Sequence, residues 1–260
     1  MAAAPQLYQW GARALYLGPA LGLSAHRNAV AVVAAGLDER FAIARDPRAP
    51  GAGAHLCRMA LILPDTLHHH SSSGGRMAFL YVDALSADLE RLKASVGKWG
   101  NGAGFALACE DRLLGLLARM DEGPAGFIAA RPVLEIEILG QAERGIAPGV
   151  RRAIEHLNRN GAARPSLEEL SAIACLSPSR FRRVFKQATG VSLKRYRLWV
   201  AMGTAMRAAA RSKSLTEAAH EAGFSSSAHF SAAFRDMFGM EPSRLLRAGL
   251  ERRYLPPRAE

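Results

Sequence analysis

The chain is poor in cysteine and has no long apolar run, and each shortage excludes a class of protein. Its three cysteines (Cys57, Cys109 and Cys175) are far apart and odd in number, so they fit no disulfide framework and no metal or redox motif. No stretch approaches the ~18 apolar residues of a membrane span. The N-terminus has no basic segment before an apolar one, as a secretory signal would have. We therefore expect a cytoplasmic chain with reduced thiols.

Basic residues outnumber acidic ones only in the second half of the chain. Residues 1–140 carry 13 Lys and Arg against 13 Asp and Glu, whereas residues 141–260 carry 21 against 10, which is the whole net charge of +11. A positive surplus confined to one segment is typical of a domain that binds nucleic-acid phosphates. A basic surface needed only for solubility would not explain this segregation.

The stretch Ser166–Gly190 has the pattern of two short helices joined by a tight turn. Ser166 followed by Glu169 is typical of a capping box at a helix start. A second helix is expected after Ser177, with Pro178 in its first turn. Its apolar stripe recurs at helical spacing and leaves a basic outer face, so the stretch predicts a helix-turn-helix motif. The stripe is Phe181, Val184, Phe185 and Ala188, and the outer face is Ser179, Arg182, Arg183 and Lys186.

The same pattern returns in Ser214–Gly239. Ser214, Leu215 and Glu217 repeat the start of the first motif at an offset of 48 residues. One extra residue in the turn makes the offset 49, which matches Phe230 to Phe181 and Gly239 to Gly190. The stretch between the motifs, Ser192–Lys213, is rich in helix formers. About 20 residues of helix span ~30 Å, close to the ~34 Å between successive major grooves on one side of DNA.

The two motifs and their spacer resemble the AraC/XylS family of transcription regulators. The resemblance rests on Ser166–Gly190, Tyr196 and Met202–Ala205 in the spacer, and Ala222-Gly223-Phe224 followed by Phe230, Phe234, Phe238, Gly239 and Pro242. It implies that residues 148–251 form two three-helix lobes joined by the long helix, with DNA read by the second helix of each motif. Cys175-Leu176 departs from the glycine and aromatic residue that the family favours there. Cys175 is therefore expected to bear a left-handed backbone or to alter the turn.

Residues 1–97 are expected to form a small β-rich domain. Short apolar runs broken by turn residues predict strands at Ala14–Leu17, Ala29–Ala35, Phe41–Ala44, Arg58–Leu63 and Met77–Val82. Short strands without helices between them suggest a small sandwich or barrel. The family resemblance implies a cupin-like barrel that binds an effector. The expected fold class is α+β: a cupin-like β-barrel with flanking helices, followed by an all-α domain of two helix-turn-helix motifs joined by a long helix.

Residues 98–147 are expected to be a helical dimerisation and linker region. A short helix capped within Ser86–Glu90 comes before it. Lys98–Gly104 is predicted to be a loop, and Phe105–Met120 a helix whose broad apolar surface either packs on the barrel or meets a partner chain. Val133–Leu139 alternates apolar and acidic residues like a strand, whereas the family resemblance implies a helix or linker here. Residues 252–260 are expected to be a tail.

The two motifs are expected to touch DNA in different ways. Arg182 and Arg183 are the candidates for base edges, since arginine can grip guanine with two hydrogen bonds. Ser179 lies on the same face, Lys186 is placed for a phosphate, and Arg180 points sideways toward the backbone. The second motif carries fewer basic residues and is expected to anchor mainly on the DNA backbone. Its candidate contacts are Ser226, Ser227, Ser231 and Arg235.

His26 and His68 are the candidate effector-pocket residues. His26 comes just before a predicted strand, and Ile62–His68 resembles the family's proline-turn-histidine segment. Histidines at such places bind metals in enzymatic cupins, but no carboxylate at ligand spacing accompanies them here. We therefore assign no metal ligands and no cofactor. Along a strand His68 and His69 would point to opposite faces, so at most His68 and His70 share one.

The sequence thus predicts a sequence-specific DNA-binding transcription regulator, not an enzyme, controlled by a small-molecule effector in the N-terminal domain. No Ser/His/Asp arrangement and no phosphate loop are present. The expected partners are double-stranded DNA, the effector, RNA polymerase and a second copy of the chain, with no membrane. Two alternatives stay open. One is a metal-binding cupin enzyme, with His26 and His68 as ligands, fused to a DNA-binding module. The other is a constitutive DNA-binding protein without a ligand.

Overall fold

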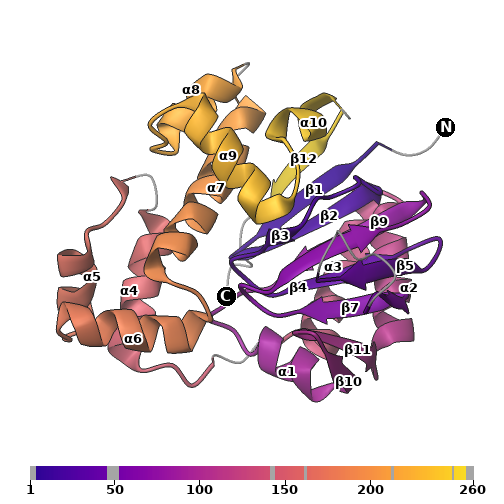
Figure 1. The fold of residues 1–260 in the computed structure, drawn as a ribbon, viewed down its shortest axis with the longest axis horizontal. Coiled ribbons are helices and arrows are strands. Elements are labelled where there is room, and N and C mark those ends of the chain that lie inside the picture. The colour runs from indigo at the N-terminus through magenta and orange to yellow at the C-terminus, as the bar shows by residue number, and fades with distance from the viewer. Residues whose placement is uncertain are drawn as a thin grey trace.

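The protein has a β-rich N-terminal part and a helical C-terminal part (Figure 1). The computed structural model describes residues 4–45, 53–140, 144–160, 163–211, 214–247 and 249–255, so most of the loop predicted at Asp46–Gly53 lies outside it. The strands of the N-terminal part are β1 (Gln6–Trp10), β2 (Arg13–Pro19), β3 (His26–Arg27), β4 (Val32–Gly36), β5 (Phe41–Ala44), β6 (His55–Cys57), β7 (Met59–Ile62), β8 (Leu67–Ser71), β9 (Arg76–Tyr81), β10 (Val96–Gly100) and β11 (Ala103–Leu107). Its helices are α1 (Asp88–Ala94), α2 (Glu110–Asp121), α3 (Pro124–Val133) and the π-helical turn η1 (Leu134–Ile138).

Two sheets facing each other make the barrel. The larger has the order β10-β11-β7-β4-β9-β2-β1-β12, and the smaller has the order β3-β8-β5-β6. On the inner face, Val32 and Phe79 of the large sheet share a core with Phe41 of the small one. On the outer face, Val33 and Leu80 pack with α2 and α3. Because β4 and β7 are buried on both faces, they appear in the sequence as continuous apolar runs. The predicted fold class is confirmed.

The segment predicted as a loop at Lys98–Gly104 is a β-hairpin. Strands β10 and β11 pair antiparallel around Asn101-Gly102, whose φ angles are 55° and 78°. Asn-Gly with two positive φ values is the favoured two-residue hairpin turn, so this dipeptide was the signal that could have located it. Helix α2 consequently begins at Glu110 and not at Phe105. The barrel therefore includes residues beyond the predicted boundary at 97.

The broad apolar surface of α2 packs inside the chain. Leu113, Leu117 and Met120 are fully buried in the core shared with the outer face of the large sheet. This surface was predicted either to pack on the barrel or to meet a partner chain. Packing on the barrel accounts for these three side chains.

The segment Val133–Leu139, whose alternation resembles a strand, is helical, as the family resemblance implied. Leu134 and Ile138, four residues apart, are both buried, as one face of a helix requires. The guanidinium of Arg91 donates to the carbonyl oxygens of Ile136, Glu137 and Leu139 and so satisfies the end of the turn. The alternation of apolar and acidic residues was misleading because tertiary contacts select the helical period.

The helices of the C-terminal part agree with the predicted duplication. They are α4 (Pro148–Arg159), α5 (Leu167–Ile173), α6 (Pro178–Thr189), α7 (Leu193–Arg211), α8 (Leu215–Glu221), α9 (Ser227–Phe238) and α10 (Pro242–Arg247). Ser166 and Ser214 cap α5 and α8 by accepting from the backbone N–H three residues later. The Glu169 carboxylate contacts His156 at 2.8 Å, a partner that the capping-box prediction did not include.

The turn between the paired helices needs a left-handed residue in both motifs. Cys175 has φ 55°, and Gly223, 48 positions later, has φ 78°. The backbone strain expected at Cys175 is therefore present, since an L-residue with a side chain rarely adopts this conformation.

Replacing Cys175 by glycine is expected to stabilise the chain by up to ~1 kcal/mol, because glycine relieves the left-handed strain at a small entropic cost. The Cys175 side chain is exposed, so little packing is lost. Gly223→Ala is the reciprocal variant and should destabilise by ~1–2 kcal/mol. Urea denaturation of the full chain measures both. Equal destabilisation by the two changes would contradict the assignment of strain.

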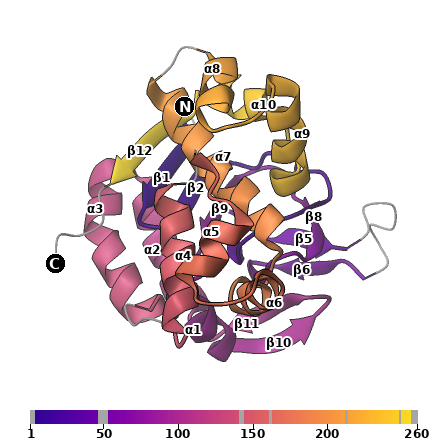
Figure 2. The ribbon, with the colours of Figure 1, turned by 90° about the vertical axis from the view of Figure 1, so that its left-hand side faces the viewer.

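The end of the chain returns to the barrel. Strand β12 (Glu251–Leu255) pairs in parallel with β1 at the edge of the large sheet (Figures 1 and 2). The predicted tail 252–260 is therefore partly a strand, and residues 256–260 lie outside the described part of the chain. Of the helices that the structure describes, none has the length and apolarity needed to cross a bilayer.

Candidate nucleic-acid interface and interdomain cavity

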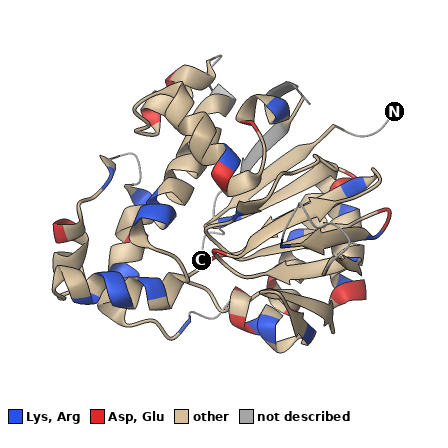
Figure 3. Cartoon of the chain, in the orientation of Figure 1, with Lys and Arg blue, Asp and Glu red and all other residues tan. Residues whose placement is uncertain are grey.

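Helix α6 exposes its basic face to solvent, because the opposite face is buried in the core of the C-terminal part. Ser177 caps the helix by accepting from the N–H of Arg180, and Pro178 occupies its first turn. Phe181 and Phe185 are fully buried, and the ring of Phe185 packs edge-on against Tyr196 of α7, with centroids 5.4 Å apart. The predicted DNA contacts on this helix are all exposed, and Figure 3 shows positive residues gathered on α4 and α6. They are Ser179, Arg180, Arg182, Arg183 and Lys186.

Helix α9 presents a less basic face. Phe230, Phe234 and Met237 are buried, while Ala228, Ala232 and Arg235 are exposed. Ser226 caps the helix by accepting from the N–H of His229, and Ser227 and Ser231 are half-buried. Arg235 is not free, because its guanidinium pairs with Glu241. The sequence reasoning missed that pairing.

The barrel holds the C-terminal end of α9. The backbone N–H and the hydroxyl of Ser24 both donate to the carbonyl of Gly239, each at 2.8 Å. Asn28 donates to the carbonyl of Met237 at 2.8 Å. A Cβ at Gly239 would come within 2.4 Å of the Ser24 carbonyl oxygen. Glycine is thus required here both for its positive φ of 72° and for this close approach.

Arg195 of α7 joins three parts of the molecule. Its guanidinium donates to the carbonyl of Arg27 and pairs with Asp236 of α9 at 2.8 Å and with Asp65 of the barrel at 3.6 Å. The spacer helix is therefore tied both to the barrel and to the second motif.

A cavity of about 550 Å³ lies between the barrel and the C-terminal part. Its walls come from both domains. Tyr16 and Phe79 belong to the inner face of the barrel, and Trp199 and Met202 to α7. Tyr81, Trp199 and Phe238 form an aromatic group in its wall, with ring centroids 5.4 to 6.2 Å apart. Arg159 and Arg207 are among its few charged lining residues. Such a space suits a largely apolar small molecule with a polar end.

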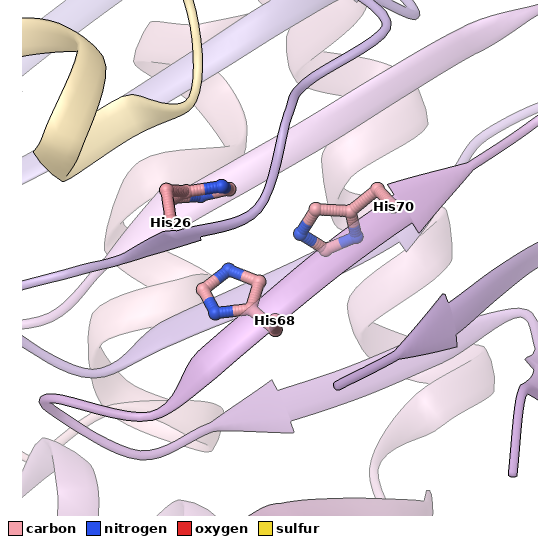
Figure 4. A group of neighbouring side chains, drawn as sticks. All are labelled: His26, His68 and His70. Atoms are coloured by element: carbon pink, nitrogen blue, oxygen red, sulfur yellow. The ribbon is translucent and has the colours of Figure 1, made fainter. Parts of the chain in front are cut away.

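His26 and His68, the predicted effector-pocket residues, do not line this cavity. They are neighbours in the β3–β8 ladder, and the structure adds His70 to them (Figure 4). All three are buried, and burial lowers the pKa of His26 to about 3 and that of His68 to about 4. The pKa of His70 lies well below its usual value for the same reason. The i, i+2 spacing of His68 and His70 was the sequence signal for their common face.

The comparisons with known proteins agree with the duplicated motif. Residues 170–248 match the family model described as a helix-turn-helix domain. The probable transcriptional regulator LumQ of Photobacterium leiognathi is 40% identical over 80 residues, which is 30% of this chain and 32% of LumQ. The HTH-type transcriptional regulator ArgR of Pseudomonas aeruginosa is 29% identical over 154 residues, which is 52% of this chain and 45% of ArgR. The chain thus spans less than half of the length of these relatives.

A solved structure is similar to this chain over both its N-terminal and its C-terminal part. ToxT from Vibrio cholerae superposes with a TM-score of 0.56 over 91% of this chain and 98% of its own, at 9% identity. At that identity the likeness shows the fold alone: a β-rich domain followed by a helical domain. The duplicated motif, the family model and the two related regulators together lead to one conclusion: residues 170–248 are a helix-turn-helix domain of the AraC/XylS type.

Proposed function

We propose that this chain is a sequence-specific DNA-binding transcription regulator whose DNA affinity is set by a small molecule bound between its two domains. The observation that carries the proposal is the duplicated helix-turn-helix. Its first recognition helix, α6, exposes five polar or basic side chains to solvent. No enzymatic step is part of it. Contact with RNA polymerase and self-association are further expectations of the same proposal.

The two motifs divide the work of recognition. Arg182 and Arg183 of α6 read base edges, with Ser179 beside them, while Arg180 and Lys186 contact the sugar-phosphate backbone. On α9, Ser226, Ser227, Ser231 and Arg235 anchor the protein on phosphates. Arg235 must exchange Glu241 for a phosphate, which reduces its net contribution. This exchange supports a secondary role for the second motif.

Selection of genomic fragments by the full chain tests this function. We expect enrichment of sites with two half-sites about one helical turn, ~10.5 bp, apart. The affinity should fall steeply as salt rises, since each phosphate contact releases counterions. Recovery of fragments with no common sequence would contradict specific recognition.

We propose that the effector binds in the interdomain cavity and not at His26 and His68. The cavity is largely apolar, and it adjoins both α7 and α9, so a ligand there contacts the helix that separates the two motifs. ToxT has been solved with an unsaturated fatty acid bound. For this chain we propose an elongated apolar molecule with an anionic end that Arg159 or Arg207 can meet.

Filling the cavity is expected to abolish the response to such a ligand. A monounsaturated fatty acid is the probe, and at 100 times its dissociation constant it should stabilise the wild type by ~2.7 kcal/mol. Met202 lines the cavity and is 1% exposed, so Met202→Trp should occupy the space and remove the stabilisation. Ile128→Trp, at a position 63% exposed on α3, is the control. Thermal melting with and without the probe measures both, and an unchanged shift in Met202→Trp would overturn the placement.

A further inference from the structure

We propose that His26, His68 and His70 form a binding site for a divalent transition-metal ion, zinc in the first place. We also infer that the bound ion holds β3 against β8 and thereby fixes the end of α9. The metal site itself is inferred from residues of the barrel alone. The effect of the ion on α9 rests on the proposed DNA-binding function.

The three side chains converge although they come from two distant strands. His26 on β3 is the direct ladder partner of His68 on β8, and His70 follows on the same face of β8. One nitrogen from each ring lies within 4.8 Å of the others. The ring centroids of His26 and His68 are 4.2 Å apart and those of His68 and His70 are 5.0 Å apart. Figure 4 shows the three rings turned toward a common point.

Backbone hydrogen bonds orient two of the three rings. Nδ1 of His26 lies 2.8 Å from the carbonyl oxygen of Ser24, and Nδ1 of His68 lies 2.8 Å from that of Thr66. Each Nδ1–H therefore donates to a carbonyl, which leaves the lone pair on Nε2. A metal-binding histidine in proteins is held in this way by a second hydrogen bond.

Three of the four remaining ring nitrogens are buried and have no hydrogen-bond partner in the described part of the molecule. Nε2 of His68 and both nitrogens of His70 are buried without a hydrogen-bond partner among the described residues. Unpaired buried polar atoms are rare in folded proteins because each costs free energy. His70 is enclosed by the rings of Phe41 and Phe79, with centroids 5.6 and 5.4 Å away, so its nitrogens can reach little besides the cluster. A metal ion at the centre would satisfy Nε2 of His68 and one of the two nitrogens of His70.

The donor set selects the kind of ion. Three neutral imidazoles suit zinc and its neighbours in the first transition row, whereas calcium and magnesium require oxygen ligands. Zinc with three histidines and a water is a known open arrangement. Zinc–nitrogen bonds of about 2.0–2.1 Å in a tetrahedral site place the nitrogens ~3.3 Å apart, so nitrogens that now lie within 4.8 Å of one another would have to move closer together.

The cluster is connected directly to the second recognition helix. Ser24, whose carbonyl accepts from His26, is the residue that donates twice to Gly239 at the end of α9. Asn28, two residues after His26, holds the carbonyl of Met237. A Cβ at Gly239 would lie 2.7 Å from Nδ1 of His26, which shows how closely the helix end sits on the histidine. An ion that restrains β3 therefore restrains α9.

Titration of the untagged full chain with zinc and cobalt(II) tests the site. We expect one ion per chain, and visible absorption of the cobalt form typical of a four-coordinate ion. His68→Gln and His70→Gln should each weaken binding by at least about tenfold, since even outer-shell changes cost 10–100-fold. His69→Gln is the matched control, because His69 lies on the other face of β8 and should leave binding unchanged.

Two results would overturn the site. One is a wild type that binds no ion, and the other is full binding in the His68 and His70 variants. Circular dichroism checks that these variants fold. If they do not, X-ray absorption of the zinc-loaded wild type decides, since three imidazole nitrogens support the site and any other donor set contradicts it.

The coupling to α9 is tested separately by DNA binding. We expect zinc to change the affinity of the wild type for its selected DNA site by several-fold. The DNA affinity of His68→Gln should be the same with and without zinc. An ion that binds without changing DNA affinity would contradict the coupling. A chain that binds no DNA in either form would contradict the proposed function, while the titration would still decide the metal site.

Discussion

Replacing Arg182 by alanine is expected to weaken binding of the full chain to its selected DNA site by ~1–3 kcal/mol and to relax the preference at one base position. The guanidinium is exposed on α6, while the helix itself is held by buried Phe181 and Phe185. Loss of the side chain should therefore leave the fold intact. An arginine that grips a guanine edge with two hydrogen bonds contributes discrimination of this size.

Arg235→Ala is the matched variant on the second motif. Arg235 is already paired with Glu241, so its gain from a phosphate is partly offset by the loss of that pair. We expect a smaller loss of affinity, spread evenly over all sequences, and a lower salt dependence. Selection of sites from a random library with each variant separates the two outcomes. An equal loss of base preference in both variants would refute the division between the motifs.

Replacing Asp88 by alanine is expected to destabilise the protein by ~3–5 kcal/mol, the range found when one partner of a buried ion pair is removed. Asp88 is fully buried and accepts from the Arg13 guanidinium at 2.7 and 2.8 Å. It also accepts from the backbone N–H of Gly140 at 3.0 Å. The change would leave the positive charge of Arg13 largely buried without its partner.

The exposed ion pair of Arg112 and Glu137 provides the control for Asp88. Their side chains are 57% and 43% exposed, so water screens the attraction. Glu137→Ala is therefore expected to destabilise the protein far less than Asp88→Ala. Urea denaturation measures both variants. Similar losses from the two changes would show that burial does not set the strength of these pairs.

The sequence located the DNA-binding part because its signals are local. The caps at Ser166 and Ser177, the stripe through Phe181 and Phe185, and the duplication at an offset of 48 all act within a few turns of helix. Helix starts and amphipathic faces are encoded by neighbours three and four residues apart. Even the strained turn at Cys175 could be anticipated, because the resembled family favours a glycine at this position.

Contacts between residues far apart in the chain were decided only by the tertiary structure. The hairpin turn at Asn101-Gly102 carried a local signal, but the helix at Val133–Leu139 depends on Arg91 and on burial against the barrel. The grouping of His26 with His68 and His70 depends on which strand lies beside β8. The cavity needs both domains in place, and the hold of Ser24 on Gly239 joins residues 215 positions apart. Sequence patterns report the period of an element and its buried face, whereas the partner of that face is selected by the packing of the whole chain.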